Sequence, residues 1–389
     1  MYPIKTIAAA GCAALLSMSV AGVAQAQNAP PPNNTDVPPL SAEAEASPLP
    51  NIIVIATGGT ISGAATDGNR TGFQSYRSGT YTMEQMLTDL PNEELFADVS
   101  WLQFGNRGSG GYRIVDYYDL SLAVDAALEI YDGVVVTTGT DTMEEFAYFL
   151  DLTVQSEKPV VITGAMRPWD VVGTDAPANL YNALFTAASG ETTGFGTVLM
   201  LNDEIHAARE VTKLNSHRLD TFGSPQFGSL GFVDEGIVRI YRVPPRALLA
   251  GSDAWATPFD LSTITAEDLP RVEIAYNYQE AGGGAIRGFV ADGAAGIVTA
   301  GTGGGGISSQ MSAARTEAIA AGVIFATTTR TGSGSVGNGG GEGIIEADNL
   351  NAQHARLLLL LSLAFTDDIE VMRGWFTTIG ASYPTLAAN

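Results

Sequence analysis

Reactive sulfur is almost absent from this sequence. Of its 389 residues only Cys12 is a cysteine, and it lies in an apolar N-terminal segment that we expect to be removed. A disulfide needs a pair of cysteines, and thiolate metal sites use several. The mature chain is therefore predicted to contain neither.

Histidine and lysine are also scarce, with three of each. None of the histidines lies in a glycine-rich turn. This argues against a Ser-His-Asp catalytic triad, because its histidine base would have to come from a helix or loop position that no motif marks. After removal of the N-terminal segment only two lysines are left, Lys158 and Lys213. The three histidines of the sequence are His206, His217 and His354.

Acidic residues dominate the charge. The formal net charge is −23 and the sequence pI is about 4.3, so the overall field disfavours nucleic acid or an anionic membrane as a partner. A hydrophobic content of 45% and a charged content of 16% are typical of a soluble globular protein. The length allows two domains and a large core.

Several common functional motifs are missing. Neither a Walker A sequence nor a Gly-x-Gly-x-x-Gly after a first strand is present, so nucleotide binding has little support. The Gly-x-Ser-x-Gly elbow occurs only in degenerate runs such as 332–335, without a strand-turn-helix context. No His/Asp/Glu cluster has the spacing of metal ligands.

The N-terminus has the composition of a secretory signal. Lys5 precedes an apolar run over 7–23, which ends in a small-x-small sequence, and this predicts cleavage after Ala26. The run is short for a membrane span, which would be the alternative. We expect a periplasmic or secreted protein. Residues 27–49 lack periodic apolar positions, and we interpret them as a disordered tether.

Short apolar runs alternate with helical stretches from residue 50 to 246. This alternation predicts βαβ units and an α/β fold, a larger N-terminal domain with a mostly parallel, doubly wound sheet. A proline-rich connection over 247–270 is interpreted as a linker, and the alternation resumes in a smaller C-terminal α/β domain, 271–389. The clearest strands are expected at 52–56, 134–138, 160–163, 198–201, 272–276, 296–300 and 323–327.

Two of these strands end in a Gly-Thr turn. Thr60 follows the first strand, and Thr140 with Asp141 follows the second. Because the carboxyl ends of neighbouring parallel strands share one edge of the sheet, we expect these side chains to surround one small volume. Simpler roles exist for each: Thr60 as a turn hydroxyl, and Asp141 as a charge at a helix start that Thr142 and Glu145 would cap.

A threonine hydroxyl becomes a nucleophile when a neighbouring base accepts its proton, and a desolvated lysine can be that base. Lys213 is the candidate, although a solvated surface lysine is the usual alternative. Residues 62–80, which follow the Thr60 turn, are rich in small polar residues and are interpreted either as a mobile lid or as an inert surface loop.

Read together, the motifs closely resemble the bacterial type II L-asparaginases. The resemblance covers residue 51 to the C-terminus, and its blocks keep their order. They are 56–61 (ATGGTI), 139–145 (GTDTMEE) with 147–151 (AYFLD), 164–168 (GAMRP), 175–182 (DAPANLYN) and 211–213 (VTK).

The resemblance implies roles for individual residues. Thr60 corresponds to the nucleophile, Thr140 to a second catalytic threonine, Asp141 to the carboxylate that binds the substrate ammonium group, and Lys213 to the base beside Thr140. Tyr76 corresponds to the lid tyrosine that contacts the nucleophile, with Tyr81 as its competitor. The remaining substrate-binding positions correspond to Ser109, Gly110 and Ala165.

Two positions depart from the family pattern. An asparagine that reaches the neighbouring subunit's site is replaced by Gly304, and the later acidic residue has only Asn338 and Glu342 as candidates. The resemblance implies hydrolysis of L-asparagine through an acyl-enzyme, with L-glutamine as a side substrate, in a homotetramer of intimate dimers without metal or cofactor. A periplasmic solute-binding protein that does not turn over its ligand is the alternative.

Overall fold

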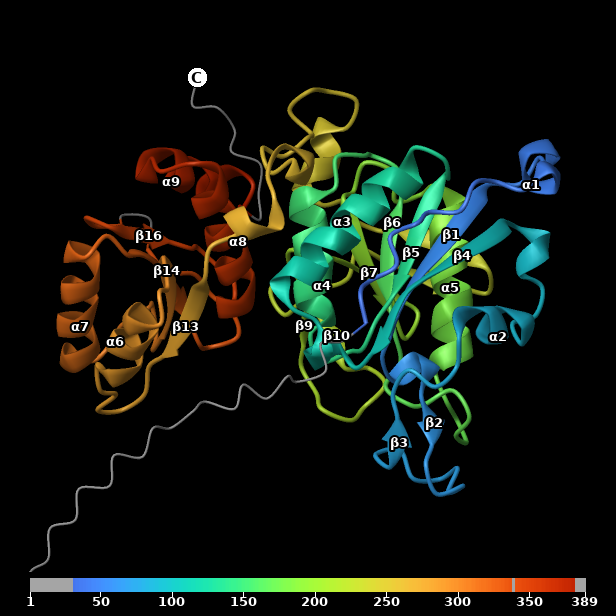
Figure 1. The fold of residues 1–389 in the computed structure, drawn as a ribbon, viewed down its shortest axis with the longest axis horizontal. Coiled ribbons are helices and arrows are strands. Elements are labelled where there is room, and N and C mark those ends of the chain that lie inside the picture. The colour runs from blue at the N-terminus through green and yellow to red at the C-terminus, as the bar shows by residue number, and fades with distance from the viewer. Residues whose placement is uncertain (1–30, 338–339, 382–389) are drawn as a thin grey trace, which may run out of the picture. The chain divides into compact units, whose positions relative to one another are not determined.

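Two separate β-sheets form the framework of the chain (Figure 1). The computed structural model describes residues 31–337 and 340–381. The predicted signal sequence and its cleavage site therefore lie outside the described residues, as does Asn338. Among the helices that the structure describes, none is long and apolar enough to cross a membrane.

The larger sheet has eight strands in the order β12-β11-β8-β7-β6-β5-β1-β4. Strands β4, β1, β5, β6 and β7 are parallel, and β8, β11 and β12 continue the sheet in antiparallel pairs. The strands are β1 (Asn51–Gly58), β4 (Asp98–Arg107), β5 (Gly133–Thr137), β6 (Val160–Thr163), β7 (Thr197–Leu201), β8 (Glu204–Ala207), β11 (Gly231–Asp234) and β12 (Ile237–Ile240).

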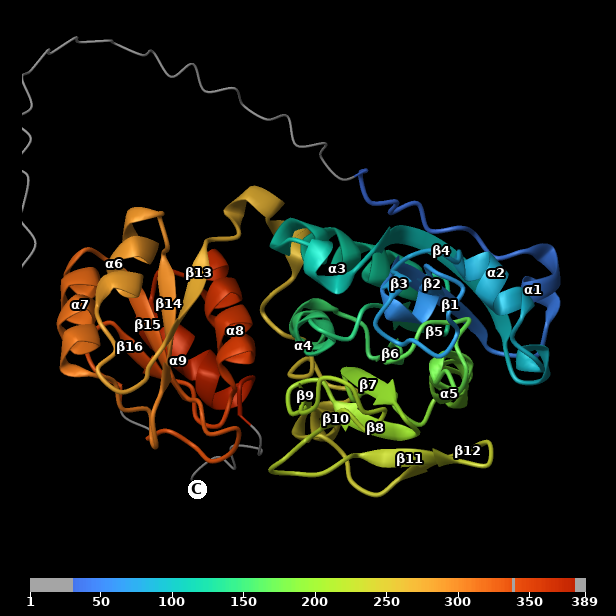
Figure 2. The same ribbon diagram turned by 90° about the horizontal axis from the view of Figure 1, so that it is seen from below.

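Helices cover both faces of this sheet (Figure 2). Successive side chains of a strand point to opposite faces, so that Ile53 and Ile55 pack with α3 (Ile114–Leu128) and α4 (Met143–Thr153). Ile52 and Val54 pack on the other side with α2 (Met83–Thr88) and α5 (Ala176–Ser189). Burial on both faces explains why β1 is a continuous apolar run, and the predicted doubly wound α/β sheet is confirmed.

The smaller sheet is fully parallel, in the order β13-β14-β15-β16. Its strands are β13 (Val272–Tyr276), β14 (Gly296–Gly301), β15 (Ile324–Thr329) and β16 (Ile344–Glu346). Helices α6 (Gly284–Ala291) and α7 (Ser309–Ala320) pack on one face. Helix α8 (Ala352–Phe365) packs against β13, β14 and β15 and also contacts α4, and α9 (Ile369–Thr378) follows it. The predicted second α/β unit is present, while the domain boundaries stay a prediction.

The prediction of a disordered tether is wrong for residues 33–49. This segment contains α1 (Ala42–Ala46) and lies against the N-terminal domain. Val37 and Leu40 pack on the hydrophobic core, and the hydroxyl of Tyr131 donates to the carbonyl of Pro38 at 2.9 Å. A few apolar residues without periodicity thus suffice to hold the segment, because the folded domain supplies the partner surface.

Candidate active site

The carboxyl ends of β1 and β5 bring the two Gly-Thr turns together. A β-carbon built on Gly59, whose φ is +88°, would lie 2.3 Å from the backbone nitrogen of Gly139. Only glycine permits such a close approach in this backbone conformation. The strand order reverses between β1 and β5, with β4 on one side and β6 on the other, and such switch points are where open α/β sheets bind ligands.

Thr60 contacts the lid residue Tyr76. Their hydroxyl oxygens lie 2.7 Å apart, and either can donate. Thr60 begins a short 3-10 helix directly after β1 and is only 8% exposed. Tyr76 lies in β3 (Tyr76–Arg77), which pairs with β2 (Ala64–Ala65). Tyr81 packs instead against the hydrophobic cluster beneath α2, so the geometry favours Tyr76 as the partner of Thr60.

Lys213 joins the residues of the second turn. Its Nζ donates to Thr140 Oγ1 at 2.8 Å and to Asp141 Oδ1 at 2.7 Å. The Lys213 side chain is 15% exposed, whereas that of Asp141 is 83% exposed. Lys213 is therefore not a solvated surface lysine, and Asp141 offers a carboxylate that is open to a ligand.

The helix cap expected at this turn is absent. Thr142 precedes α4 but makes no side-chain capping bond, and Glu145 instead forms an ion pair with Arg356 at 3.7 Å. Capping therefore does not account for the polar residues after Thr140.

The expected substrate-binding residues border the same turns. Ser109 is buried in a 3-10 turn after β4, and a β-carbon on Gly139 would lie 2.9 Å from the β-carbon of Ser109. Gly110 is the exposed next residue of that turn. Ala165 is buried just after β6, next to Gly164, whose β-carbon would lie 3.5 Å from Thr140 Cγ2. All of the predicted positions of the first domain thus converge on one edge of the sheet.

Gly304 and Glu342 do not belong to this edge. Gly304 is exposed in the turn after β14, and Glu342 is exposed before β16, so both lie on the second sheet.

Glu144 is a site neighbour to which the sequence reasoning gave no role. Its Oε2 accepts a hydrogen bond from the backbone N–H of Lys213 at 2.6 Å, and its Oε1 accepts one from Gln353 of α8 at 3.1 Å. Burial raises the pKa of Glu144. Glu144 thus fixes the backbone of Lys213 to α4. The sequence signal for Glu144 was its place in the 139–145 block, which leads into the buried helix α4.

The lid segment is docked rather than loose. The backbone N–H of Ala65 donates to Asp170 Oδ1 at 3.0 Å, and the N–H of Trp169 donates to the carbonyl of Gly63 at 3.0 Å. The guanidinium of Arg167 stacks on Phe73 at 4.4 Å. A polar segment therefore packs by hydrogen bonds and one cation–π contact, which its composition did not predict.

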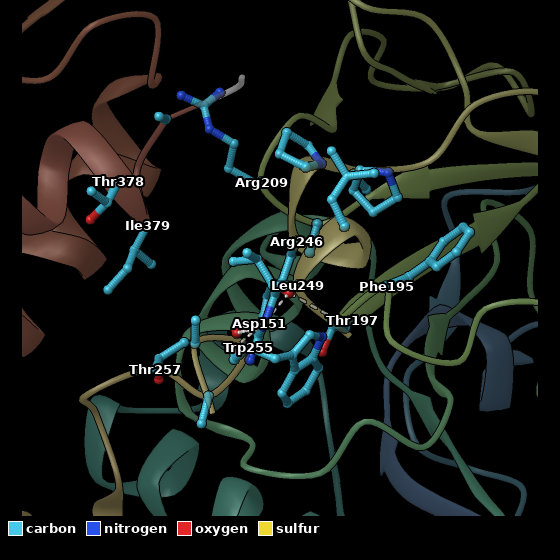
Figure 3. A pocket seen from close by; sticks show the side chains of 18 of the residues that line it. Asp151, Phe195, Thr197, Arg209, Arg246, Leu249, Trp255, Thr257, Thr378 and Ile379 are labelled. Carbon is cyan, nitrogen blue, oxygen red and sulfur yellow. Dashed lines mark hydrogen bonds and ion pairs between the residues drawn. The ribbon is translucent and has the colours of Figure 1, made fainter. Parts of the chain in front are cut away.

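The described residues also form a cavity of about 320 Å³ away from this edge (Figure 3). Asp151 and Arg246 form an ion pair of 3.1 Å in its wall, and Arg246 stacks on Trp255 at 3.8 Å. The predicted site residues are not among those that line it. Within the described part of the chain, no group of three or more His, Cys, Asp or Glu side chains could hold a metal ion.

Comparison with protein families matches both halves of the chain. Residues 51–246 match the model for the N-terminal domain of asparaginase, and residues 271–376 match the glutaminase/asparaginase C-terminal domain. The chain belongs to the asparaginase family. The resemblance found in the sequence motifs is therefore confirmed.

Individual asparaginases are similar over most of their length. L-asparaginase 2 of Bacillus subtilis is 38% identical over 337 residues, which cover 85% of this chain and 87% of the relative. A probable periplasmic L-asparaginase of Haemophilus influenzae is 35% identical, covering 86% and 94%. The crystal structure of a probable cytoplasmic L-asparaginase from Campylobacter jejuni has a TM-score of 0.79 and 35% identity, and the match covers 84% of this chain and 99% of that one.

Proposed function

We propose that this protein hydrolyses L-asparagine to L-aspartate and ammonia. The observation that carries the proposal is the pairing of two threonine hydroxyls with separate partners at one sheet edge, Thr60 with Tyr76 and Thr140 with Lys213. L-asparagine is the substrate in the names of the similar proteins. L-glutamine is a second substrate in our proposal, because the matched C-terminal family includes glutaminases.

In the proposed reaction, Thr60 Oγ1 attacks the carboxamide carbon, and the hydrogen-bonded hydroxyl of Tyr76 accepts the Thr60 proton while it passes its own proton on to the amide nitrogen. Backbone N–H groups of the Gly-Thr turns stabilise the oxyanion. The nitrogen protonated in this way leaves as ammonia and an ester of Thr60 remains, which water hydrolyses to release the acid. Thr140 and Lys213 form a second hydrogen-bonded pair, in which Lys213 is the basic partner of the Thr140 hydroxyl.

Substrate binding uses the groups around these hydroxyls. Asp141 provides a carboxylate for the substrate ammonium group, and Ser109 provides a hydroxyl for the α-carboxylate. A second copy of the chain would contribute the turn at Gly304, in a tetramer built from dimers. The protein is proposed to be exported, in line with its N-terminal composition and the name of the Haemophilus relative.

Release of ammonia from L-asparagine by the purified mature protein tests the function directly. Thr60→Ala should lose nearly all turnover and still bind L-aspartate, whereas Thr71→Ala should be fully active, because the Thr71 hydroxyl bonds only within the exposed lid tip, to Asn69 at 2.7 Å. A wild-type protein that binds asparagine without releasing ammonia would support the solute-binding alternative. Near-normal turnover in Thr60→Ala would refute the assigned nucleophile.

A further inference from the structure

Asn33 joins the two ends of the turn that carries Ser109. This turn begins after Arg107 at the end of β4 and ends at Arg113, where α3 starts. The Arg107 guanidinium donates to Asn33 Oδ1 at 2.6 Å. The Asn33 amide nitrogen donates to Asp116 of α3 at 2.8 Å and to Asp119 at 3.0 Å. One side chain thus holds a cation before the turn and two carboxylates after it.

The groups that Asn33 contacts also support the turn itself. The Arg107 side chain lies 4.6 Å over the ring of Tyr112 and donates to the carbonyl of Gly111 at 3.4 Å. The hydroxyl of Tyr112 donates in turn to the carbonyl of Thr57 in β1. Asp116 accepts from the backbone N–H of Arg113 at 2.7 Å. Arg107 and Asp116 therefore fix the backbone on both sides of Ser109.

The charges of this network are shielded from water. Asp116 is 2% exposed, and its ion pair with Arg107 has an N–O distance of 3.6 Å. Burial alone would raise the pKa of Asp116, but hydrogen bonds from Arg113 and Asn33 and the charge of Arg107 hold it below its usual value. Hydrogen bonds between such charged groups are strong, and losing one in a buried place is costly.

Asn33 lies outside the region that matches the asparaginase family, which begins at residue 51. The segment that follows it contacts the edge strand β4, where the N–H of Asn34 donates to the carbonyl of Phe104. Figure 2 shows the segment beside β4 and ending near α1. The Asn33 side chain of this N-terminal extension thus supports the turn that carries Ser109.

We propose that Asn33 is a positioning residue for the substrate α-carboxylate: it clamps Arg107 to Asp116 and thereby sets the position of Ser109. The inference rests on the proposed function. Ser109 contacts the part of the substrate that does not react, so its displacement weakens binding more than it slows the chemical step. Loss of Asn33 should therefore raise KM and leave kcat almost unchanged.

The experiment compares wild type with Asn33→Ala and with Asn34→Ala as the matched control. The Asn34 side chain is exposed and only accepts from the backbone N–H of Asp36 at 3.1 Å. We expect Asn33→Ala to raise the KM for L-asparagine and the Ki of L-aspartate by about five- to tenfold, with kcat within about twofold of wild type. Asn34→Ala should match wild type in all three constants.

Asn33→Asp tests the clamp itself. This variant keeps an acceptor for Arg107 but places a carboxylate beside Asp116 and Asp119, so its KM should rise at least as much as that of Asn33→Ala. A lower melting temperature of Asn33→Ala with unchanged KM would overturn the proposal, since Asn33 would then serve stability alone. An unchanged KM in Asn33→Asp would also overturn it. A wild type that releases no ammonia would refute the proposed function instead.

Discussion

At the scale of single residues, the hydroxyl pair of Thr60 and Tyr76 is the sharpest test of the reaction. Tyr76→Phe removes one partner of a 2.7 Å hydrogen bond while keeping the ring. If the hydroxyl acts in the transition state, kcat should fall by more than about tenfold and KM should change little. Steady-state kinetics on L-asparagine measure both constants. Tyr81→Phe is the control, and a loss of kcat there instead of in Tyr76→Phe would reverse our assignment.

His354 provides a stability prediction that does not depend on catalysis. Its ring packs on Tyr148 at a centroid distance of 4.7 Å, and its Nδ1 lies 3.1 Å from the carbonyl oxygen of Arg209. Burial, with a contribution from the charge of Arg209, lowers the pKa of His354 to about 3. In the unfolded chain the pKa is about 6.5. The unfolded state therefore binds more protons between these values, and the stabilising contribution is complete above about pH 6.5 and is lost as the pH falls.

From about pH 7 to about pH 5 the loss due to His354 should be about 2 kcal/mol. His354→Asn should lack it, so that its free energy of unfolding changes by that much less over the same interval in urea titrations. Asp125, whose pKa burial raises to about 6, contributes a slope of opposite sign in both proteins and cancels in the comparison. Equal pH dependence in the two proteins would contradict a neutral buried imidazole.

Residue-level prediction from the sequence worked where a motif and a strand end coincided. Thr60, Thr140 and Asp141 could be assigned to one edge because parallel strands end together, whereas Ser109 was assigned only through the resemblance to the family. The choice between Tyr76 and Tyr81 depends on how the lid folds back, which local sequence does not encode. The hydrogen bond from Asn33 to Asp116 joins residues 83 positions apart, and neither residue lies in a motif that predicts this contact.

At the scale of elements, the sequence predicted the strands that are buried on both faces. The runs at 52–56 and 134–138 are continuous and apolar, and they became β1 and β5. Strand β4 was missed because it lies at the edge of the sheet and alternates: Trp101 is exposed while Leu102 is buried. Edge strands carry this mixed pattern, which a search for apolar runs passes over.

The lid is the element whose docking can be tested directly. Asp170→Ala removes the acceptor of the Ala65 N–H, so residues 63–80 should exchange amide hydrogens faster and kcat/KM should fall by about tenfold. Asp67→Ala is the control, because that carboxylate accepts only from the N–H of Asn69 within the exposed lid, at 2.9 Å. Unchanged exchange in Asp170→Ala would show that the lid is held by its other contacts.

At the scale of the whole molecule, the proposed tetramer makes the second domain part of another copy's site. By the resemblance Gly304 corresponds to an asparagine of the family, and a β-carbon there would meet nothing within 4 Å. Gly304→Asn should therefore fold normally and lower the KM for L-asparagine by about tenfold, by adding a hydrogen bond to the substrate ammonium group. Gly303→Asn is the control in the same turn, because its β-carbon also meets nothing within 4 Å and asparagine is among the residues that best tolerate its φ of +53°.

Glu342→Gln tests the remaining possibility, that the Glu342 carboxylate already supplies the contact to the substrate ammonium group. If it does, KM should rise in Glu342→Gln and change little in Gly304→Asn. A wild-type KM in the low micromolar range that neither variant alters would show that other groups replace both contacts.

The segment before the first strand bears on how the chain avoids edge-to-edge aggregation. An edge strand exposes unpaired N–H and C=O groups that can recruit a strand from another molecule. Here the N–H of Asn34 donates to the carbonyl of Phe104, and Val37 and Leu40 pack against the core cluster that includes Leu102 and Phe104 of β4. Residues 33–50 precede β4 in the chain, so the part of the edge at Phe104 is occupied by the same polypeptide rather than by a neighbour.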